Sequence, residues 1–201
     1  MIALVNLSKT FRLNGRTKTV ADRINAVFPT GSSVALLGRN GAGKSTLLQM
    51  ISGNILPSSG EILSTGSISW PVGFAGSFHK DLTGEQNVRF IARVYGIDTD
   101  AMCDFVNDFA ELGPHFHLPF RTYSSGMRAR LAFGMSMALK FDTYLIDEVT
   151  AVGDAQFRRK STRLLRARLV DASAVVVSHS MSTLQSYCTS GAVLEGGRLT
   201  Y

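Results

Sequence analysis

The sequence predicts an α/β protein with a mainly parallel core sheet, an N-terminal antiparallel β region and an inserted helical lobe. A strand-like run at residues 33–37 leads through a glycine-rich turn into a helix-like stretch at 46–51, which is the opening of an α/β unit. Two further apolar runs, 144–146 and 174–177, are typical of strands that are buried on both faces. Between these parts, residues 82–140 repeat apolar positions at helical spacing, which predicts the lobe.

The first thirty residues alternate short β-like runs with turn residues. The runs lie at 2–5, 18–20 and 24–28, and Asn14-Gly15 separates the first two. Such a pattern predicts antiparallel strands. The chain starts without a basic leader and is polar again by Asn6, so we interpret its start as a strand rather than a signal peptide.

The helical lobe has three apolar faces and a clear start. Thr83 and Gln86 form a capping-box pattern ahead of the first face, and Gly113-Pro114 ends the second. The third face follows Ser125. The apolar positions of the three faces are Val88, Ile91, Ala92 and Tyr95; Met102, Phe105, Val106, Phe109 and Leu112; and Leu131, Met135, Ala138 and Leu139. We therefore expect one domain, 1–201, in which residues 1–81 and 141–201 form the core and 82–140 form the lobe.

Composition limits the kinds of partner and the location that fit this chain, but it does not identify the function. Lys and Arg outnumber Asp and Glu by 21 to 15 in 201 residues, which gives a net charge of +6 and a pI near 9.6. This balance suits an anionic partner such as a nucleotide, a nucleic acid or the inner face of a membrane. The longest apolar runs are far shorter than the roughly 20 residues of a membrane span. We expect folding in the cytosol and two buried, reduced thiols at Cys103 and Cys188.

A phosphate-binding loop is the most specific motif. The segment GRNGAGKS matches G-x-x-x-x-G-K-[ST] in full, with the required strand before it and the helix behind it. Its glycines let backbone amides approach phosphates, Lys44 is expected to bridge the β- and γ-phosphates of ATP, and the Ser45 hydroxyl is expected to bind Mg²⁺. The nucleotide-binding residues predicted here are Gly38, Arg39, Asn40, Gly41, Ala42, Gly43, Lys44, Ser45 and Thr46.

Two consecutive acids follow the apolar run at 144–146. Asp147 ends a strand-like segment, where a carboxylate can reach Mg²⁺ through water. Glu148 then points at the attacking water and is a candidate general base. This placement favours water over a small molecule as phosphoryl acceptor, although small-molecule kinases also carry such a loop.

A second anion site is predicted at YSSGM. Ser124 or Ser125 can cap the helix that begins there, and Gly126 leaves its first amides unobstructed. With the phosphate loop and the acidic pair, this segment resembles the nucleotide-binding subunit of ABC transporters, and the likeness runs along essentially the whole chain. That family's signature typically reads LSGGQ, of which this chain keeps Ser124 and Gly126.

The resemblance implies an ABC-type P-loop NTPase and further site residues. In the family, the signature segment clasps ATP held by a second subunit, so the chain should act as a homodimer. Asp154 matches the aspartate of the loop that crosses the dimer interface, and His179 matches the histidine that contacts the γ-phosphate. Phe11 stands where the family stacks an aromatic ring on adenine, more often Tyr.

One position departs from the family pattern. The family usually has a Gln after a core strand, which links nucleotide and metal to the membrane partner. Here WPVGFAGSFH occupies that loop, and His79 lies nearest the expected place. Gln86 is the nearby glutamine, but its capping-box position gives it a structural role.

Three longer segments are similar to ATPases that export capsular polysaccharide, with relatives that export O-antigen and teichoic acid. They are SISWPVGFAGSFHKDLTGEQNV, YSSGMRARLAFGMSMALKFD and IDEVTAVGDAQF. The similarity implies integral membrane permease subunits as partners, a lipid-linked polysaccharide as cargo, and a peripheral position on the cytoplasmic face of the bacterial inner membrane.

Two other functions stay open. A soluble ABC-type ATPase acting on nucleic acid would suit the basic charge, but aromatic residues are not interleaved with basic ones, so nucleic acid is not expected. A small-molecule kinase would leave YSSGM and His179 unexplained. A basic stretch is interpreted as a solvated helix face, with anionic lipid contact as its alternative; it contains Arg158, Arg159, Lys160, Arg163, Arg166 and Arg168.

Overall fold

A computed structural model describes residues 1–13, 15–74, 76, 78–148 and 153–201. The chain divides into two compact units. The first contains Met1–Pro71, Phe141–Glu148 and Leu169–Tyr201, and the second contains Val72–Lys140 and Val149–Arg168. The expectation that both belong to one domain stays a prediction.

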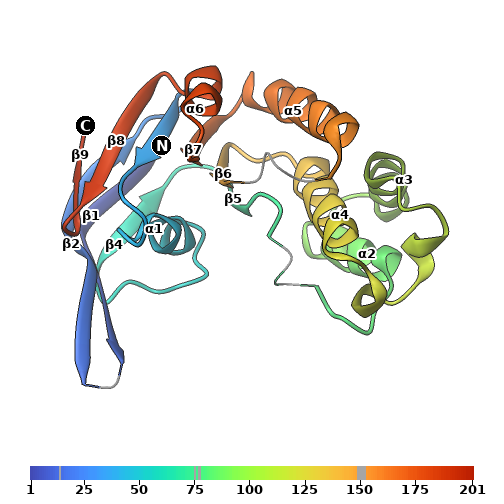
Figure 1. Ribbon diagram of the computed structural model, residues 1–201, viewed down its shortest axis with the longest axis horizontal. Helices are drawn as coiled ribbons and strands as arrows, with labels where there is room; N and C mark the ends of the chain where they lie inside the picture. The colour runs from blue at the N-terminus through green and yellow to red at the C-terminus, as the bar shows by residue number, and fades with distance from the viewer. Residues whose placement is uncertain (14, 75, 77, 149–152) are drawn as a thin grey trace. The chain divides into compact units, whose positions relative to one another are not determined.

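The first unit holds two sheets (Figure 1). The smaller sheet is antiparallel, as expected, in the order β2-β1-β4, with β1 at Ile2–Leu13, β2 at Arg16–Phe28 and β4 at Ser59–Ser64. The larger sheet has the order β5-β6-β7-β3-β8-β9 and is parallel except at its last pair. Its strands are β3 (Ser33–Leu37), β5 (Ile68–Pro71), β6 (Thr143–Asp147), β7 (Ser173–Val177), β8 (Ser190–Glu195) and β9 (Arg198–Thr200).

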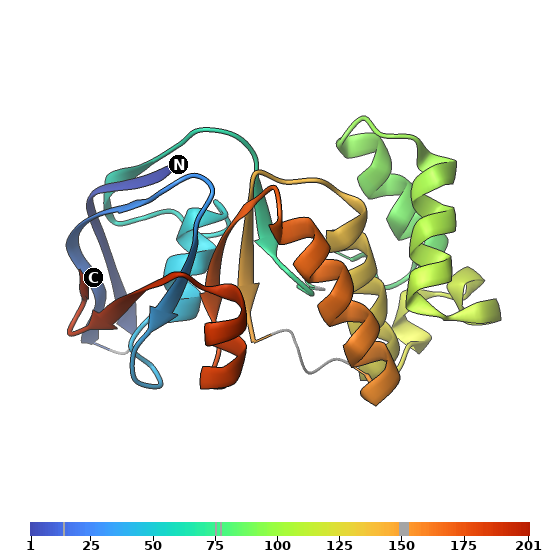
Figure 2. The same cartoon turned by 90° about the horizontal axis from the view of Figure 1, so that it is seen from above.

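Helix α1 (Lys44–Ile51) joins the two sheets in one core. Leu47, Leu48, Met50 and Ile51 are buried and belong to one cluster with apolar residues of β1, β2, β3 and β7. Figures 1 and 2 show α1 between the two sheets. Helix α6 (Met181–Tyr187) contacts β7. Because α1 starts directly after the glycine-rich turn, its first amides are fixed at the carboxyl edge of β3.

The second unit is helical. It contains α2 (Gly84–Val94), α3 (Thr99–Ala110), α4 (Ser125–Ala138) and all but the last residue of α5 (Ala155–Leu169), with short 3₁₀ turns at Gly113–His117 and Phe120–Thr122. The capping box is confirmed: the Thr83 hydroxyl accepts from the Gln86 amide, and the Gln86 side chain accepts from the Thr83 amide. Aromatic packing centres on Phe109, whose ring contacts those of Phe105, Phe133 and Phe157.

Three expectations about the helices need correction. The residues predicted for the third apolar face are buried or half-buried, but the second half of α4 is not amphipathic, because every residue from 131 to 137 is buried. Tyr95 follows the end of α2 and is exposed. Cys103 is buried as expected, whereas Cys188 is only half-buried; both thiols are free, and burial raises the pKa of Cys188 to about 11.

Within the described residues, no helix is both long and apolar enough to cross a bilayer.

Candidate nucleotide-binding site

The predicted phosphate loop lines a pocket of about 390 Å³ in the first unit. Gly43 is the N-cap of α1 and has φ of 109°, a conformation that side chains rarely adopt. A Cβ atom there would also lie 2.9 Å from Cβ of Val20. Gly38 is held equally closely, because a Cβ would collide with the carbonyl oxygen of Leu194. Glycine is therefore required at both positions, 38 and 43, for the loop to close over the start of α1.

Lys44 projects back over the loop. Its Nζ donates to the carbonyl oxygens of Gly38 at 2.7 Å and Arg39 at 3.1 Å. These bonds keep the ammonium beside the loop amides, so a phosphate group in the pocket would meet a cation and the positive end of α1 together. The loop residues that line the pocket are Asn40, Gly41, Gly43, Lys44, Ser45 and Thr46.

The carboxyl ends of β6 and β7 bring acids and a histidine to the same pocket. Asp147 ends β6, and Glu148 follows it with φ of 55°, a left-handed conformation that is uncommon outside glycine. The Glu148 amide donates to the Val177 carbonyl at 3.0 Å, which fixes this turn against β7. As a result the Glu148 Oε1 lies 2.7 Å from Nε2 of His179.

The Glu148–His179 contact is the feature that sequence spacing did not reveal. The two residues are 31 positions apart, and only the adjacency of β6 and β7 in the sheet joins them. Both side chains remain substantially exposed, Glu148 at 49% and His179 at 62%. They can therefore meet a ligand and water in the pocket as well as each other.

The β1–β2 hairpin also lines the pocket. Phe11 lines the pocket and is 39% exposed, so part of its side chain is accessible to a ligand. Nζ of Lys9 lies 5.1 Å from the centre of this ring, on which it makes a cation–π contact. Two lining residues of the hairpin were absent from the sequence prediction, Lys18 and Val20.

Three predicted loop residues, Gly38, Arg39 and Ala42, are absent from the pocket lining. The other predicted site residues, His79, Ser124, Gly126 and Asp154, belong to the second unit. Ser124 is the N-cap of α4, and its Oγ accepts from the Met127 amide at 3.2 Å, so the choice between Ser124 and Ser125 is decided for Ser124. A Cβ at Gly126 would approach only Oγ of Ser124, at 4.0 Å. Packing within the described chain therefore does not require a glycine there.

Asp154 has a local structural role. Its Oδ1 accepts from the amides of Gln156 and Phe157, both at 2.9 Å, and caps the start of α5. Its Oδ2 pairs with Arg130 at 2.7 Å. The amides of Phe157 and Gln156, and the nearby Arg130, hold the pKa of Asp154 below its usual value. The four residues before Gly153 in this motif, 149–152, lie outside the described residues.

His79 is fixed by a buried amide. Asn87 is 3% exposed, and its Oδ1 accepts from the His79 amide at 2.8 Å. Its Nδ2 donates to the carbonyls of His79, Leu82 and Thr83. The His79 Nδ1 accepts from the Asp81 amide at 3.3 Å. Asn87 thus ties the loop before α2 to the helix; residues 75 and 77 of that loop lie outside the described part.

The basic helix α5 mixes two roles. Arg158, Arg159, Arg163 and Arg166 are exposed, as expected for a solvated face. Lys160 instead pairs with Glu111 at 2.7 Å, and Arg168 donates twice to the Met137 carbonyl. The solvated-face interpretation is therefore wrong for these two cations, which fasten α5 to its neighbours.

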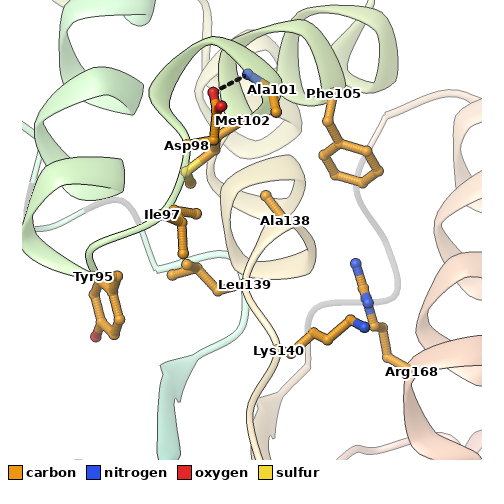
Figure 3. Close-up of a pocket in the computed structure, with 10 residues that line it drawn as sticks. All are labelled: Tyr95, Ile97, Asp98, Ala101, Met102, Phe105, Ala138, Leu139, Lys140 and Arg168. Carbon is orange, nitrogen blue, oxygen red and sulfur yellow. Dashed lines mark hydrogen bonds between the residues drawn. The ribbon is translucent and has the colours of Figure 1, made fainter.

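A second pocket, mostly apolar, lies wholly in the helical unit (Figure 3). Its volume is about 540 Å³. The Asp98 carboxylate is occupied as the N-cap of α3, accepting from the amides of Asp100 and Ala101. Lys140 and Arg168 give the lining a cationic part. The other lining residues are Tyr95, Ile97, Ala101, Met102, Phe105, Ala138 and Leu139.

Residues 21–151 match the sequence profile described as ABC transporter. The chain belongs to the ABC transporter family. The fold matches solved structures. A dimeric ATP-binding cassette in a post-hydrolysis state with ADP and Pi aligns at a TM-score of 0.82 and 21% identity, covering 100% of this chain and 97% of that one. This structural likeness supports the fold.

Several relatives within the ABC family are much closer in sequence. The polysialic acid transport ATP-binding protein KpsT of Escherichia coli is 50% identical over 94% of this chain and 85% of its own length. The ATP-binding protein BexA of Haemophilus influenzae is 47% identical, over 98% and 91%. The capsule polysaccharide export ATP-binding protein CtrD of Neisseria meningitidis serogroup B is 46% identical, over 99% and 92%.

Proposed function

We propose that this chain binds and hydrolyses ATP to power export of a capsular polysaccharide. The observation that carries the ATPase part is the pocket in which the phosphate loop, Asp147 and the Glu148–His179 pair meet. The export part rests on relatives at 46–50% identity that are named for polysialic acid transport or capsule polysaccharide export. Export of O-antigen or teichoic acid is the alternative, with relatives at 34–37% identity.

The pocket suits Mg-ATP along its length. Phe11 would stack on the adenine, while the loop amides and Lys44 would hold the β- and γ-phosphates. The Ser45 hydroxyl and the Asp147 carboxylate line the same pocket and are hard oxygen donors, which Mg²⁺ prefers. The ion would neutralise charge on the phosphates.

Glu148 would act on the water that attacks. Its carboxylate accepts a proton as the water oxygen bonds to the γ-phosphorus and the bond to the β–γ bridging oxygen breaks, releasing ADP and phosphate. The 2.7 Å contact with His179 would orient Glu148 and keep the imidazole close to the γ-phosphate.

Two copies of the chain would close over two nucleotides. Ser124 and Gly126 would bind the γ-phosphate held by the partner copy, using α4 amides as the anion site. The open space at the Gly126 α-carbon supports a ligand contact there. A side chain at this position would not collide with this chain, but it would obstruct a phosphate bound by the α4 amides. Asp154 would reach the dimer interface, and His79 would take the place of the sensor glutamine.

The dimer would bind integral membrane permease subunits from the cytoplasmic face of the bacterial inner membrane, and the permease would carry the lipid-linked polysaccharide. Exposed apolar residues near the helical-unit pocket, Val94, Tyr95 and Ile97, support a protein contact on this unit. The nucleic-acid function has no comparable support.

Purification from native membranes tests this function. We expect two polytopic proteins to accompany the chain, ATPase activity in the complex, and loss of one surface polymer in a deletion strain. Restoration of the polymer by wild-type chain but not by Lys44→Ala would link export to the nucleotide site. Salt-sensitive retention of DNA or RNA without any polytopic protein would contradict the proposal and favour the nucleic-acid function.

A further inference from the structure

Lys18 is a second lysine at the nucleotide pocket, and it lies outside the phosphate-loop motif. It lies on β2 and lines the pocket together with Phe11 and the loop. Its Nζ donates to the carbonyl oxygen of Gly41 at 3.2 Å. The side chain therefore spans from the hairpin to the middle of the loop.

The register of the hairpin fixes where Lys18 acts. Phe11 and Lys18 are directly paired residues of β1 and β2. Paired residues of antiparallel strands place their side chains on the same face, with Cβ atoms about 5 Å apart. A lysine stem is long enough to carry the ammonium from beside the Phe11 ring to Gly41.

This position differs from that of Lys44. The Lys44 ammonium is bound at the carbonyls of Gly38 and Arg39, whereas Lys18 reaches the loop at Gly41 from the side of the aromatic ring. A nucleotide whose base stacks on Phe11 has its sugar and first phosphate next to that ring. An ammonium has three N–H donors, so Lys18 can bond a phosphate oxygen while it keeps the Gly41 carbonyl.

We propose that Lys18 is a nucleotide-binding residue whose ammonium donates to the α-phosphate, the phosphate next to the sugar. The inference rests on the proposed function, because it takes the base to lie on Phe11. It adds a cation that the loop motif does not supply, and it makes the β1–β2 hairpin a phosphate-binding element as well as a base platform.

Two substitutions and a matched control test the inference. Lys18→Met keeps most of the length of the side chain and removes its charge, and Lys18→Arg keeps the charge. Arg16→Met removes one positive charge from the same face of β2, two residues away, at an exposed residue that does not line the pocket. Urea unfolding midpoints establish that each variant is folded before ADP binding is measured by calorimetry.

We expect Lys18→Met to weaken ADP binding about three- to fivefold, the upper part of the range for an exposed charge pair. Lys18→Arg should stay within about twofold of wild type, and Arg16→Met should bind like wild type. The ³¹P resonance of the α-phosphorus of bound ADP should move in Lys18→Met, while the β-phosphorus resonance stays near its wild-type position.

Three results would each overturn the inference. Lys18→Met could bind ADP with wild-type affinity, or Arg16→Met could lose as much ADP affinity as Lys18→Met. The third is movement of the β-phosphorus resonance of bound ADP without movement of the α-phosphorus resonance. Lys44→Ala separates this failure from failure of the proposed function. If wild type binds ADP and Lys44→Ala does not, the nucleotide site stands whatever Lys18 does. If wild type binds no ADP, the proposed function and the inference about Lys18 are both wrong.

Discussion

At the residue scale, the chemistry depends on side chains that two adjacent strand ends bring together. Glu148 takes a left-handed backbone conformation, and its amide is bonded to the Val177 carbonyl. That turn sets its carboxylate against His179. A conformation of this kind costs roughly 1–2 kcal/mol and persists where the surroundings hold it.

Glu148→Gln should abolish turnover and leave ATP binding intact. The amide keeps the size of the side chain but cannot accept the proton from water, so the rate of phosphate release should fall about 10²–10⁴-fold. Phosphate release and ATP affinity, measured on the same preparation, check this. Turnover near the wild-type rate would contradict the role assigned to Glu148.

At the element scale, the buried Asn87 side chain and the Asp154 cap each fix a polar segment to a helix. Asn87 anchors the loop that carries His79 to α2, and Asp154 caps α5 while it pairs with Arg130 of α4. Both residues are polar and near the proposed chemistry in the sequence, yet each has a structural role within its own unit.

Asn87→Ala should lower the free energy of unfolding by about 1–3 kcal/mol, because it removes the acceptor of the part-buried His79 amide and a second donor to the carbonyls of His79 and Thr83. Urea titration followed by circular dichroism measures this. Asn107→Ala is the matched control: the buried Oδ1 of Asn107 has no partner among the described residues, so its removal should cost little. Equal losses in both variants would contradict the anchoring role of Asn87.

The pKa of Asp154 predicts a pH dependence with a definite sign. The α5 amides lower this pKa in the folded chain, so the carboxylate stabilises the fold above its unfolded pKa of about 3.9. This contribution is lost as the pH falls through the lower folded value. The difference in urea midpoint between wild type and Asp154→Asn should therefore shrink from pH 5 to pH 2.

Asp104→Asn, at an exposed carboxylate of α3, serves as the control for general charge effects at low pH. Its midpoint should follow that of wild type throughout. A difference for Asp154→Asn that stayed constant or grew with acidification would mean that Asp154 does not act through its charge.

At the scale of the whole molecule, the two units divide the proposed work. The first unit holds the pocket with the loop, the acids and His179, and the second holds the Ser124 cap and the apolar pocket. Under the proposed function, one copy of the chain does not hold a complete ATP site, because its α4 amides would bind the nucleotide of the partner copy.

Ser124→Arg should prevent ATP-dependent dimerisation. In a Glu148→Gln background, which would hold ATP unhydrolysed, size-exclusion chromatography with light scattering should show a dimer that the added arginine removes by obstructing the anion site. ATP binding to each monomer should persist. Ser124→Asn is the control, since Asn also caps helices well; a normal dimer in Ser124→Arg would exclude the proposed arrangement.

The sequence by itself determined the elements whose patterns are local. The loop GRNGAGKS, the strands at 33–37 and 174–177, the Thr83–Gln86 capping box and the acidic pair at the end of β6 are all where the spacing predicted them. These features depend on neighbouring residues, because turn geometry, capping and side-chain period act over a few positions. Strands β4, β5, β8 and β9 were given no predicted range, since their short, polar or mixed sequences become strands only through their sheet partners.

Only the tertiary structure decided which distant residues meet. Sheet order put β6 beside β7 and thereby Glu148 beside His179, and hairpin register put Lys18 beside Phe11. It also buried the second half of α4 on every side and gave Asp154 a capping role. The physical reason is that strand pairing and packing join segments far apart in the chain, and no local period records which segments will be neighbours.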